Sequence, residues 1–274
     1  VLFIIYVEAA LRTLRPKIES TIPITPNELI YADDVDFLFH TKEEAERHLT
    51  TISEGLAQWN LKVNEAKTEI TIVDRNLDGW RKVRKLGSLL DTKEDIQRRK
   101  TLAIVAFNNM QNIWIRRQNI KRSKLIRIYN ALVIPILIYN SGTWGLNQKD
   151  SNSLDAFHRK QLRRLLGIRW DDKMTNKELY QISKSTPLSI TTKTARWRLF
   201  GHILRRERSI PVQLAMDAYF KSEGPKYRGR EPASLLTVLH QELSKATTSV
   251  TRDHTYCIKQ IPTQLTSLEG LELL

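Results

Sequence analysis

The chain of 274 residues contains a single cysteine, Cys257. One cysteine cannot form a disulfide within the chain and is too few for a zinc site built from cysteines, so both are excluded. No apolar run approaches the roughly 20 residues that a membrane-spanning helix needs. The apolar stretch 1–7 has no basic residue before it, which is not the pattern of a secretory signal peptide. Because the chain begins at Val1 inside this stretch, we expect a truncated fragment.

Apolar residues make up 41% of the chain, which is enough for a hydrophobic core and argues against a wholly disordered chain. The net charge is +14, and it is unevenly distributed. Residues 1–78 carry −6, residues 79–230 carry +22 and residues 231–274 carry −2. A strongly basic segment of this size predicts a polyanionic partner.

The acidic segment has the pattern of a small α/β unit. Residues 28–39 hold two short apolar runs separated by acids, which predicts a β-hairpin with the acids at its tip. Thr41 to Glu44 is a capping box that opens a helix. Alternation at Ile70 to Ile72 predicts a strand, and a further strand is predicted around 83–90.

From residue 94 onward the apolar spacing is mostly helical. Asp150 and Ser151 are predicted to cap one helix, and Thr175 to Glu178 forms a second capping box. Within these helices, His202 is expected to be a packed core residue. Trp170 could stack on a base, but burial is the preferred prediction.

Asp33 and Asp34 are the first candidates for chemistry. Two adjacent carboxylates repel each other, and a divalent cation such as Mg²⁺ relieves that repulsion by taking their oxygens. Two such metals can activate a hydroxyl and stabilise a leaving oxygen. Taken alone, however, two acids in a turn are better explained by the ordinary preference of Asp for turns.

The residues around the acid pair strengthen the metal hypothesis. Tyr31-Ala32-Asp33-Asp34 resembles the catalytic hairpin motif of reverse transcriptases. The flanking segments resemble neighbouring motifs of the same family in the same order: Val1 to Glu8, Gly55-Leu56 with Leu61 to Thr68, and Leu86-Gly87. A lone four-residue match is weak, whereas four matches in sequence over about 90 residues are specific.

The later part of the chain resembles non-LTR (LINE-type) retrotransposon reverse transcriptases. Ala131 to Trp144 is similar to their thumb, Arg163 to Trp170 to the helix that follows it, and Arg196 to Arg230 to their C-terminal region. The resemblance implies an α+β fold: a partial polymerase palm (β-hairpin, helix, strands) followed by a mainly α-helical thumb and C-terminal region. The implied domains are 1–92 (palm), 93–148 (thumb), 149–245 (basic helical region) and 246–274 (a tail of unknown role).

The resemblance implies RNA-directed DNA synthesis with two Mg²⁺ (or Mn²⁺) ions in the complete enzyme. Asp33 and Asp34 would bind metal, and Lys67 would donate a proton to the departing pyrophosphate. Tyr31, Ala32, Leu86 and Gly87 would lie near the primer or nucleotide. The implied partners are an RNA template, a DNA primer and deoxynucleoside triphosphates, and the implied location is nucleus and cytoplasm. Because the family's first catalytic Asp is absent, we expect the chain alone to be inactive.

The basic segment contains Arg-rich clusters that exceed an ordinary solvated helix face. Arginine suits phosphate contact through its planar fork, which gives affinity without base reading. The predicted nucleic-acid-binding residues are Lys121, Arg122, Lys124, Arg163, Arg164, Arg169, Arg196, Arg198, Arg205, Arg206, Lys226, Arg228 and Arg230.

Three alternatives stay open. The chain could be a non-catalytic nucleic-acid-binding remnant of a retroelement, or an intron maturase, which shares the Tyr-Ala-Asp-Asp hairpin. The match at Gly201 to Arg206 favours the retrotransposon over the maturase. A purely structural helical protein is disfavoured by the charge division.

Overall fold

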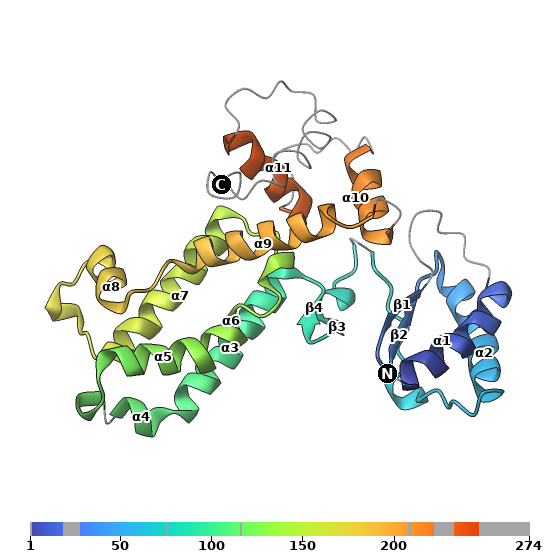
Figure 1. The fold of residues 1–274 in the computed structure, drawn as a ribbon, viewed down its shortest axis with the longest axis horizontal. Coiled ribbons are helices and arrows are strands. Elements are labelled where there is room, and N and C mark those ends of the chain that lie inside the picture. Colours follow the sequence, from blue (N-terminus) through green and yellow to red (C-terminus); the bar gives the residue numbers. More distant parts are fainter. Residues whose placement is uncertain are drawn as a thin grey trace. The chain divides into compact units, whose positions relative to one another are not determined.

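The computed structural model describes residues 2–18, 28–74, 76–115, 117–207, 210–221 and 233–246 (Figure 1). The chain divides into two compact units, which are described separately: residues 1–80 with 206–224, and residues 81–205 with 225–274. The described residues are mostly helical with two small antiparallel sheets, which is compatible with the predicted α+β class. No helix among them is long and apolar enough to cross a membrane.

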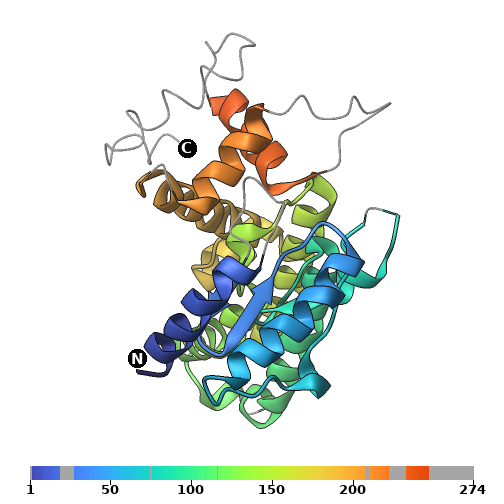
Figure 2. The same ribbon diagram turned by 90° about the vertical axis from the view of Figure 1, so that its right-hand side faces the viewer.

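The first unit packs two helices against a hairpin. Its elements are α1 (Leu2–Leu14), η1 (Arg15–Lys17), β1 (Glu28–Tyr31), β2 (Asp34–Phe37), α2 (Lys42–Ala57), η2 (Glu65–Lys67) and α10 (Pro211–Lys221). Figure 2 shows α1 and α2 beside the hairpin. Gly55 permits close packing of the two helices, since a Cβ there would lie 1.9 Å from a methyl carbon of Leu14. Val35, Phe37 and Phe39 pack against the core that α1 and α2 form.

Two of the predicted strands need correction. The segment around Ile70 and Ile72 forms no strand, and both side chains are exposed. An alternating segment forms a strand only when it pairs with another strand, and among the described residues β1 and β2 pair with each other and not with this segment. The 83–90 segment is not one strand but a tight hairpin of β3 (Arg84–Lys85) and β4 (Ser88–Leu89).

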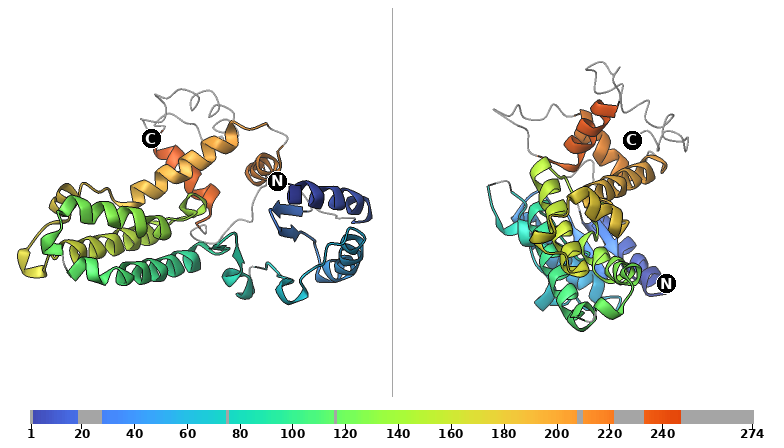
Figure 3. Two further views of the ribbon diagram at one scale, coloured as in Figure 1. Left: turned by 60° about the horizontal axis from the view of Figure 1, so that its bottom comes forward. Right: turned by 90° about the vertical axis from the view of Figure 1, so that its left-hand side faces the viewer.

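The second unit is a helical body that follows this hairpin. Its helices are α3 (Thr92–Asn109), α4 (Gln111–Ile115), η4 (Arg117–Asn119), α5 (Arg122–Leu132), α6 (Ile134–Leu137), η5 (Ser141–Thr143), α7 (Gln148–Leu166), η6 (Trp170–Asp172), α8 (Asn176–Ser183), α9 (Leu188–Leu204) and α11 (Leu235–Ala246). The turn η3 (Gly79–Lys82) precedes β3 in the sequence. Tyr129, Leu154 and Leu162 are fully buried at the centre of the hydrophobic core of the second unit. Figure 3 shows α11 lying against α9.

The helix starts test the capping predictions. Thr41 accepts a hydrogen bond from the backbone N–H of Glu44, as predicted, although the Glu44 carboxylate accepts from His40 N rather than from Thr41 N. The Thr175–Glu178 capping box is confirmed in both directions. The predicted cap at Asp150 and Ser151 is wrong.

The cap of α7 is Asn147, whose Oδ1 accepts from Asp150 N at 2.9 Å, so the helix begins three residues earlier than predicted. Asn is as good an N-cap as Asp or Ser, and the order of candidates along the sequence does not decide between them.

Two side chains predicted to be buried are exposed. His202 is exposed on α9, whereas the preceding residues Phe200 and Gly201 are buried. Trp170 is 89% exposed at the turn η6. Both predictions failed because neither the apolar neighbours of His202 in sequence nor the apolar ring of Trp170 fixes the direction in which the side chain points.

Candidate functional site

The acid pair lies at the tip of the β1–β2 hairpin. Tyr31 pairs with Asp34, so Ala32 and Asp33 are the two turn residues. Ala32 has a φ of 57°, a left-handed conformation in which an L-residue is strained by about 1–2 kcal/mol. Strain of this kind persists only where the surroundings enforce it and is concentrated at functional sites.

The side chains at the tip are available to a ligand. Tyr31, Asp33 and Asp34 are all exposed, and neither carboxylate makes a hydrogen bond or ion pair with the described residues. Arg15 anchors the other end of the hairpin, because its guanidinium pairs with Glu8 at 2.8 Å and donates from Nε to Glu28 at 2.6 Å. Hydrogen bonds from Arg15 and Arg12 lower the pKa of Glu8 from 4.5 to about 2, so its carboxylate stays ionised well into the acidic range.

The residues present fit part of a Mg²⁺ site. Magnesium is commonly bound by one or two carboxylates together with substrate phosphates and water. Asp33 and Asp34 can supply those carboxylates. Within the described ranges, however, no three His, Cys, Asp or Glu side chains group closely enough to hold an ion. The hairpin therefore offers an incomplete ligand set that substrate oxygens would have to extend.

Lys67 belongs to the same unit as the acid pair. It ends the 3₁₀ turn η2, where Lys67 N donates to Asn64 O at 3.0 Å and Thr68 Oγ1 donates to the same carbonyl at 2.9 Å. Its side chain is exposed. The turn fixes the backbone of Lys67 and leaves the ammonium group on the surface.

The second unit contains the other residues predicted to lie near a primer, Leu86 and Gly87. They form the two-residue turn between β3 and β4, and both have positive φ, at 47° and 81°. This is the φ pattern of the type I′ hairpin turn. Glycine tolerates it, whereas Leu86 is strained and 53% exposed.

Hydrogen bonds from three side chains clamp the carbonyls of this turn. Gly87 O accepts from Arg98 Nη1 at 2.9 Å and from Arg99 Nη2 at 2.5 Å. Leu86 O accepts from Tyr139 OH at 3.0 Å, and the Arg99 guanidinium lies 4.4 Å from the centre of the Tyr139 ring. The turn is therefore fixed to α3 on one side and to the segment before η5 on the other.

A buried carboxylate, Asp95, organises the same region. Only 1% exposed, it accepts from Leu89 N and from Trp144 Nε1, each at 3.0 Å, and lies 3.5 Å from Arg99 Nε. The sequence interpretation missed Asp95 and Arg99. Their i, i+4 spacing was the available signal, but that spacing is more typical of a surface ion pair.

Most of the predicted nucleic-acid-binding cations are on the surface. Lys121, Arg122 and Lys124 are exposed at the start of α5 and make no ion pair with the described residues. Arg164 is exposed but partly held, because its guanidinium lies 4.9 Å from the centre of the Phe107 ring. Arg163 is half-buried and donates to Asn176 at 2.9 Å. The remaining exposed members are Arg169, Arg198, Arg205 and Arg206, whereas Lys226, Arg228 and Arg230 lie outside the described residues.

Arg196 differs from the rest of the predicted set. It is 3% exposed, pairs with Glu242 at 2.8 Å and donates to Trp144 O at 2.9 Å. Glu242 also accepts from Trp197 Nε1 at 2.8 Å. Arg196 therefore fastens α11 to α9 and η5, a placement that does not suit contact with a phosphate backbone.

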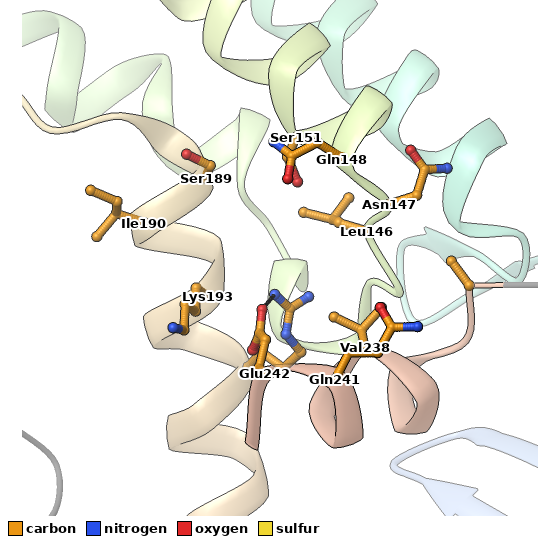
Figure 4. Close-up of a pocket in the computed structure, with 12 residues that line it drawn as sticks. Leu146, Asn147, Gln148, Ser151, Ser189, Ile190, Lys193, Val238, Gln241 and Glu242 are labelled. Carbon is orange, nitrogen blue, oxygen red and sulfur yellow. Dashed lines mark hydrogen bonds and ion pairs between the residues drawn. The ribbon is translucent and has the colours of Figure 1, made fainter. Parts of the chain in front are cut away.

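A cavity of about 370 Å³ lies beside this ion pair. Figure 4 shows Lys193 and Ser189 from α9, Ser151 and Gln148 from α7, and Gln241 from α11 around it. Apart from Arg196, none of the predicted site residues lines the cavity. Within the second unit, it is thus separate from the clamped turn.

Comparison with known proteins identifies one family. Residues 1–105 match the family model described as reverse transcriptase (RNA-dependent DNA polymerase). The matched segment contains Asp33, Asp34, Lys67 and the Leu86–Gly87 turn, and ends within α3. No curated protein and no solved structure matches the chain significantly. The first part of the chain is thus similar in sequence to reverse transcriptases.

Proposed function

We propose that this chain is part of an RNA-directed DNA polymerase of a LINE-type retrotransposon, acting by two-metal nucleotidyl transfer on an RNA template. One observation carries the proposal: the hairpin tip presents two exposed carboxylates inside a segment that matches the reverse transcriptase family. Such an enzyme would work in the nucleus and cytoplasm of its host. The LINE assignment rests on the resemblance of residues 131–230.

Each candidate residue has a role in this proposal. Asp33 and Asp34 bind Mg²⁺ or Mn²⁺ together with triphosphate oxygens. Lys67 protonates the departing pyrophosphate. The primer end lies near Tyr31 and Ala32 and is gripped by Leu86 and Gly87. The palm comprises residues 1–92, the thumb 93–148 and the basic helical region 149–245.

The clamped turn adds support for the primer role. A loop that positions a reacting end must hold its geometry to a fraction of an ångström. Arg98, Arg99 and Tyr139 provide such fixation by binding both turn carbonyls. We therefore assign Arg99 and Asp95 as positioning residues for the primer, acting through the turn.

The chain alone is expected not to extend a primer. Among the described residues, no three His, Cys, Asp or Glu side chains group closely enough to hold an ion, so the hairpin tip by itself does not offer the ligands for two metal ions. The same observation favours a second candidate, a nucleic-acid-binding remnant without catalysis. Both candidates bind template–primer, but only the first predicts metal binding at the tip.

Binding of Mn²⁺ at the hairpin tests the proposal directly. With Mn²⁺ and a deoxynucleoside triphosphate, amide NMR signals of residues 31–35 should broaden. The broadening should disappear in a D33N/D34N double variant and persist in Glu43→Gln, an exposed acid on α2 of the same unit. Absence of broadening at the tip in the unsubstituted chain would favour the remnant.

Primer extension is the complementary measurement. We expect no incorporation on an RNA template with Mg²⁺. Clear incorporation that Asp33→Asn abolishes would overturn the expected inactivity while supporting the polymerase assignment.

A further inference from the structure

Trp170 is the most exposed of the tryptophans in the second unit. Its side chain is 89% exposed, whereas Trp114, Trp144 and Trp197 are at most 5% exposed. Complete burial of a large apolar side chain is worth about 1.5–3 kcal/mol, so this position forgoes a sizeable stabilisation. Single exposed apolar side chains are common on protein surfaces, so exposure alone assigns no partner to Trp170, and the support and the surroundings of the ring have to be considered.

The segment that carries Trp170 is fixed at both ends. Ile168 and Met174 pack against the core on either side of the turn. Arg169 N donates to Asp172 Oδ2 at 2.7 Å, and Lys173 N donates to Trp170 O at 3.1 Å. The turn η6 is therefore a rigid support, and the exposure of the indole follows from the position of its backbone.

Side chains from neighbouring elements tighten the same support. Arg163 Nη2, on α7, donates to Met174 O at 3.3 Å and to Asn176 Oδ1 at 2.9 Å. These bonds bridge the end of α7 to the start of α8 across the turn. Rigid presentation of an aromatic ring lowers the entropy lost on binding.

The surroundings of Trp170 are charged rather than apolar. Arg169, Asp171, Asp172 and Lys173 are all exposed around it. Protein-binding hot spots lie in well-packed, desolvated pockets near the centre of an interface, and the 89%-exposed ring of Trp170 does not lie in such a pocket. A nucleobase needs only the face of the ring, and cations beside the ring suit the phosphates on either side of the base.

The acids near Trp170 are partly engaged within the chain. Asp172 caps η6 through Arg169 N, and Glu178 accepts from Thr175 N at 2.7 Å. The hydrogen bonds that Glu178 accepts from the backbone N–H and the hydroxyl of Thr175 lower the pKa of Glu178, so its carboxylate stays ionised and bound to the helix start. Arg169, Lys173 and Lys177 are the exposed cations of the same segment.

We propose that Trp170 stacks on an unpaired base of single-stranded nucleic acid, with Arg169 and Lys173 beside the adjoining phosphates. The inference rests on the proposed function, since it assumes that the chain binds nucleic acid. It adds a contact that is selective for unpaired over paired bases. It also gives the basic helical region a point of base contact beside its backbone contacts.

Fluorescence and affinity measurements on the whole chain test the inference. A 12-nucleotide single-stranded RNA should quench part of the tryptophan emission, and the quenched component should be missing in Trp170→Phe. Because a stacked base is worth about 1–3 kcal/mol, Trp170→Ala should weaken binding of this RNA about tenfold. The control variant is Ile182→Ala, a 39%-exposed apolar residue on α8 that should bind like the unsubstituted chain.

An abasic strand of the same length isolates the stacking contribution. It retains the phosphates and lacks the bases, so Trp170→Ala and the unsubstituted chain should bind it equally. Unchanged melting temperature in W170A shows that the loss is local.

Three results would overturn the inference. Equal RNA affinity of Trp170→Ala and Ile182→Ala would remove the stacking contact and leave the proposed function intact. Self-association that W170A abolishes would assign the tryptophan to a protein contact. Absence of any nucleic-acid binding by the unsubstituted chain would contradict the proposed function, and the stacking contact with it.

Discussion

Asp95 shows how much a single residue can determine that its local sequence does not reveal. Its neighbours in sequence predict an ordinary helix with a surface ion pair to Arg99. The structure buries it because Trp144, 49 residues away, donates to it, and because Leu89 N needs an acceptor. Long-range partners of this kind cannot be identified from one sequence, so the clamp around the Leu86–Gly87 turn was not predictable.

Removing the Asp95 carboxylate should destabilise the second unit strongly. Asp95→Ala leaves Arg99 buried without its counter-charge and the Trp144 N–H without an acceptor. Breaking a buried pair in this way costs about 3–5 kcal/mol, and we expect a loss of that order in the free energy of unfolding. Urea denaturation measures it, with the exposed Lys93→Gln on the same helix as control. A loss below about 1 kcal/mol would contradict the assigned role.

His158 is a titratable residue inside the core. It is 2% exposed, and its ring stacks on Tyr129 with centroids 5.9 Å apart and lies 6.1 Å from the Tyr180 ring. Burial lowers its pKa from 6.5 to about 4, partly opposed by Asp155 and reinforced by Arg159. The folded chain therefore holds His158 neutral at pH values where the unfolded chain protonates it.

The free energy of unfolding should accordingly decrease as the pH is lowered through a defined window. Between the two pKa values the unfolded state binds more protons, so the free energy of unfolding decreases as pH drops from 6.5 towards 4. The difference between the two pKa values corresponds to a maximum loss of about 3 kcal/mol in the free energy of unfolding. Above pH 6.5 none of this stability is lost. Denaturation at several pH values measures the slope.

His158→Phe serves as the matched variant, because it keeps a ring against Tyr129 and removes the titration. Its stability should depend less on pH in the same window. An identical slope in both proteins would assign the dependence to other groups.

At the scale of elements, local sequence rules worked where structure is local. The β1–β2 hairpin and the Thr175 capping box depend on a few adjacent residues, and both were predictable. The segment around Ile70 was not, because a strand needs a neighbouring edge that local sequence does not supply.

The start of α7 allows a direct comparison between two capping residues. Asn147→Ala removes the acceptor of Asp150 N, and loss of such a cap costs about 1 kcal/mol. Ser151→Ala lies inside the helix and should cost much less. Thermal unfolding of the two variants distinguishes the observed cap from the one predicted by sequence. A larger effect at Ser151 would mean that α7 starts later than Asn147.

At the scale of the whole molecule, the sequence predicts which part of the chain is basic. It predicts only in part which cations are exposed and can contact a nucleic acid. Counting residues locates the excess of positive charge in 79–230, but counting cannot separate exposed cations from buried ones. Arg196 is buried and paired with Glu242, whereas Lys121, Arg122 and Lys124 are exposed without ion pairs to the described residues. Only cations of the second kind can release counterions from a nucleic acid.

The salt dependence of binding follows from this distinction. Each phosphate contact contributes about 0.9 to the slope of log affinity against log salt for duplex DNA. Replacing Lys121, Arg122 and Lys124 with Gln should therefore reduce the slope for an RNA–DNA duplex by up to about 3, and weaken binding at low salt.

The matched control replaces three cations of the acidic first segment, Lys42, Arg47 and Lys62, with Gln. It changes the net charge equally, so any effect of total charge alone appears in both variants. If binding depends on individual contacts, only the variant that lacks Lys121, Arg122 and Lys124 should have a smaller slope. Each of these cations that contacts a phosphate releases counterions from the nucleic acid. Equal slopes in the two variants would show that the basic surface acts through its overall field, and would remove α5 from the nucleic-acid interface.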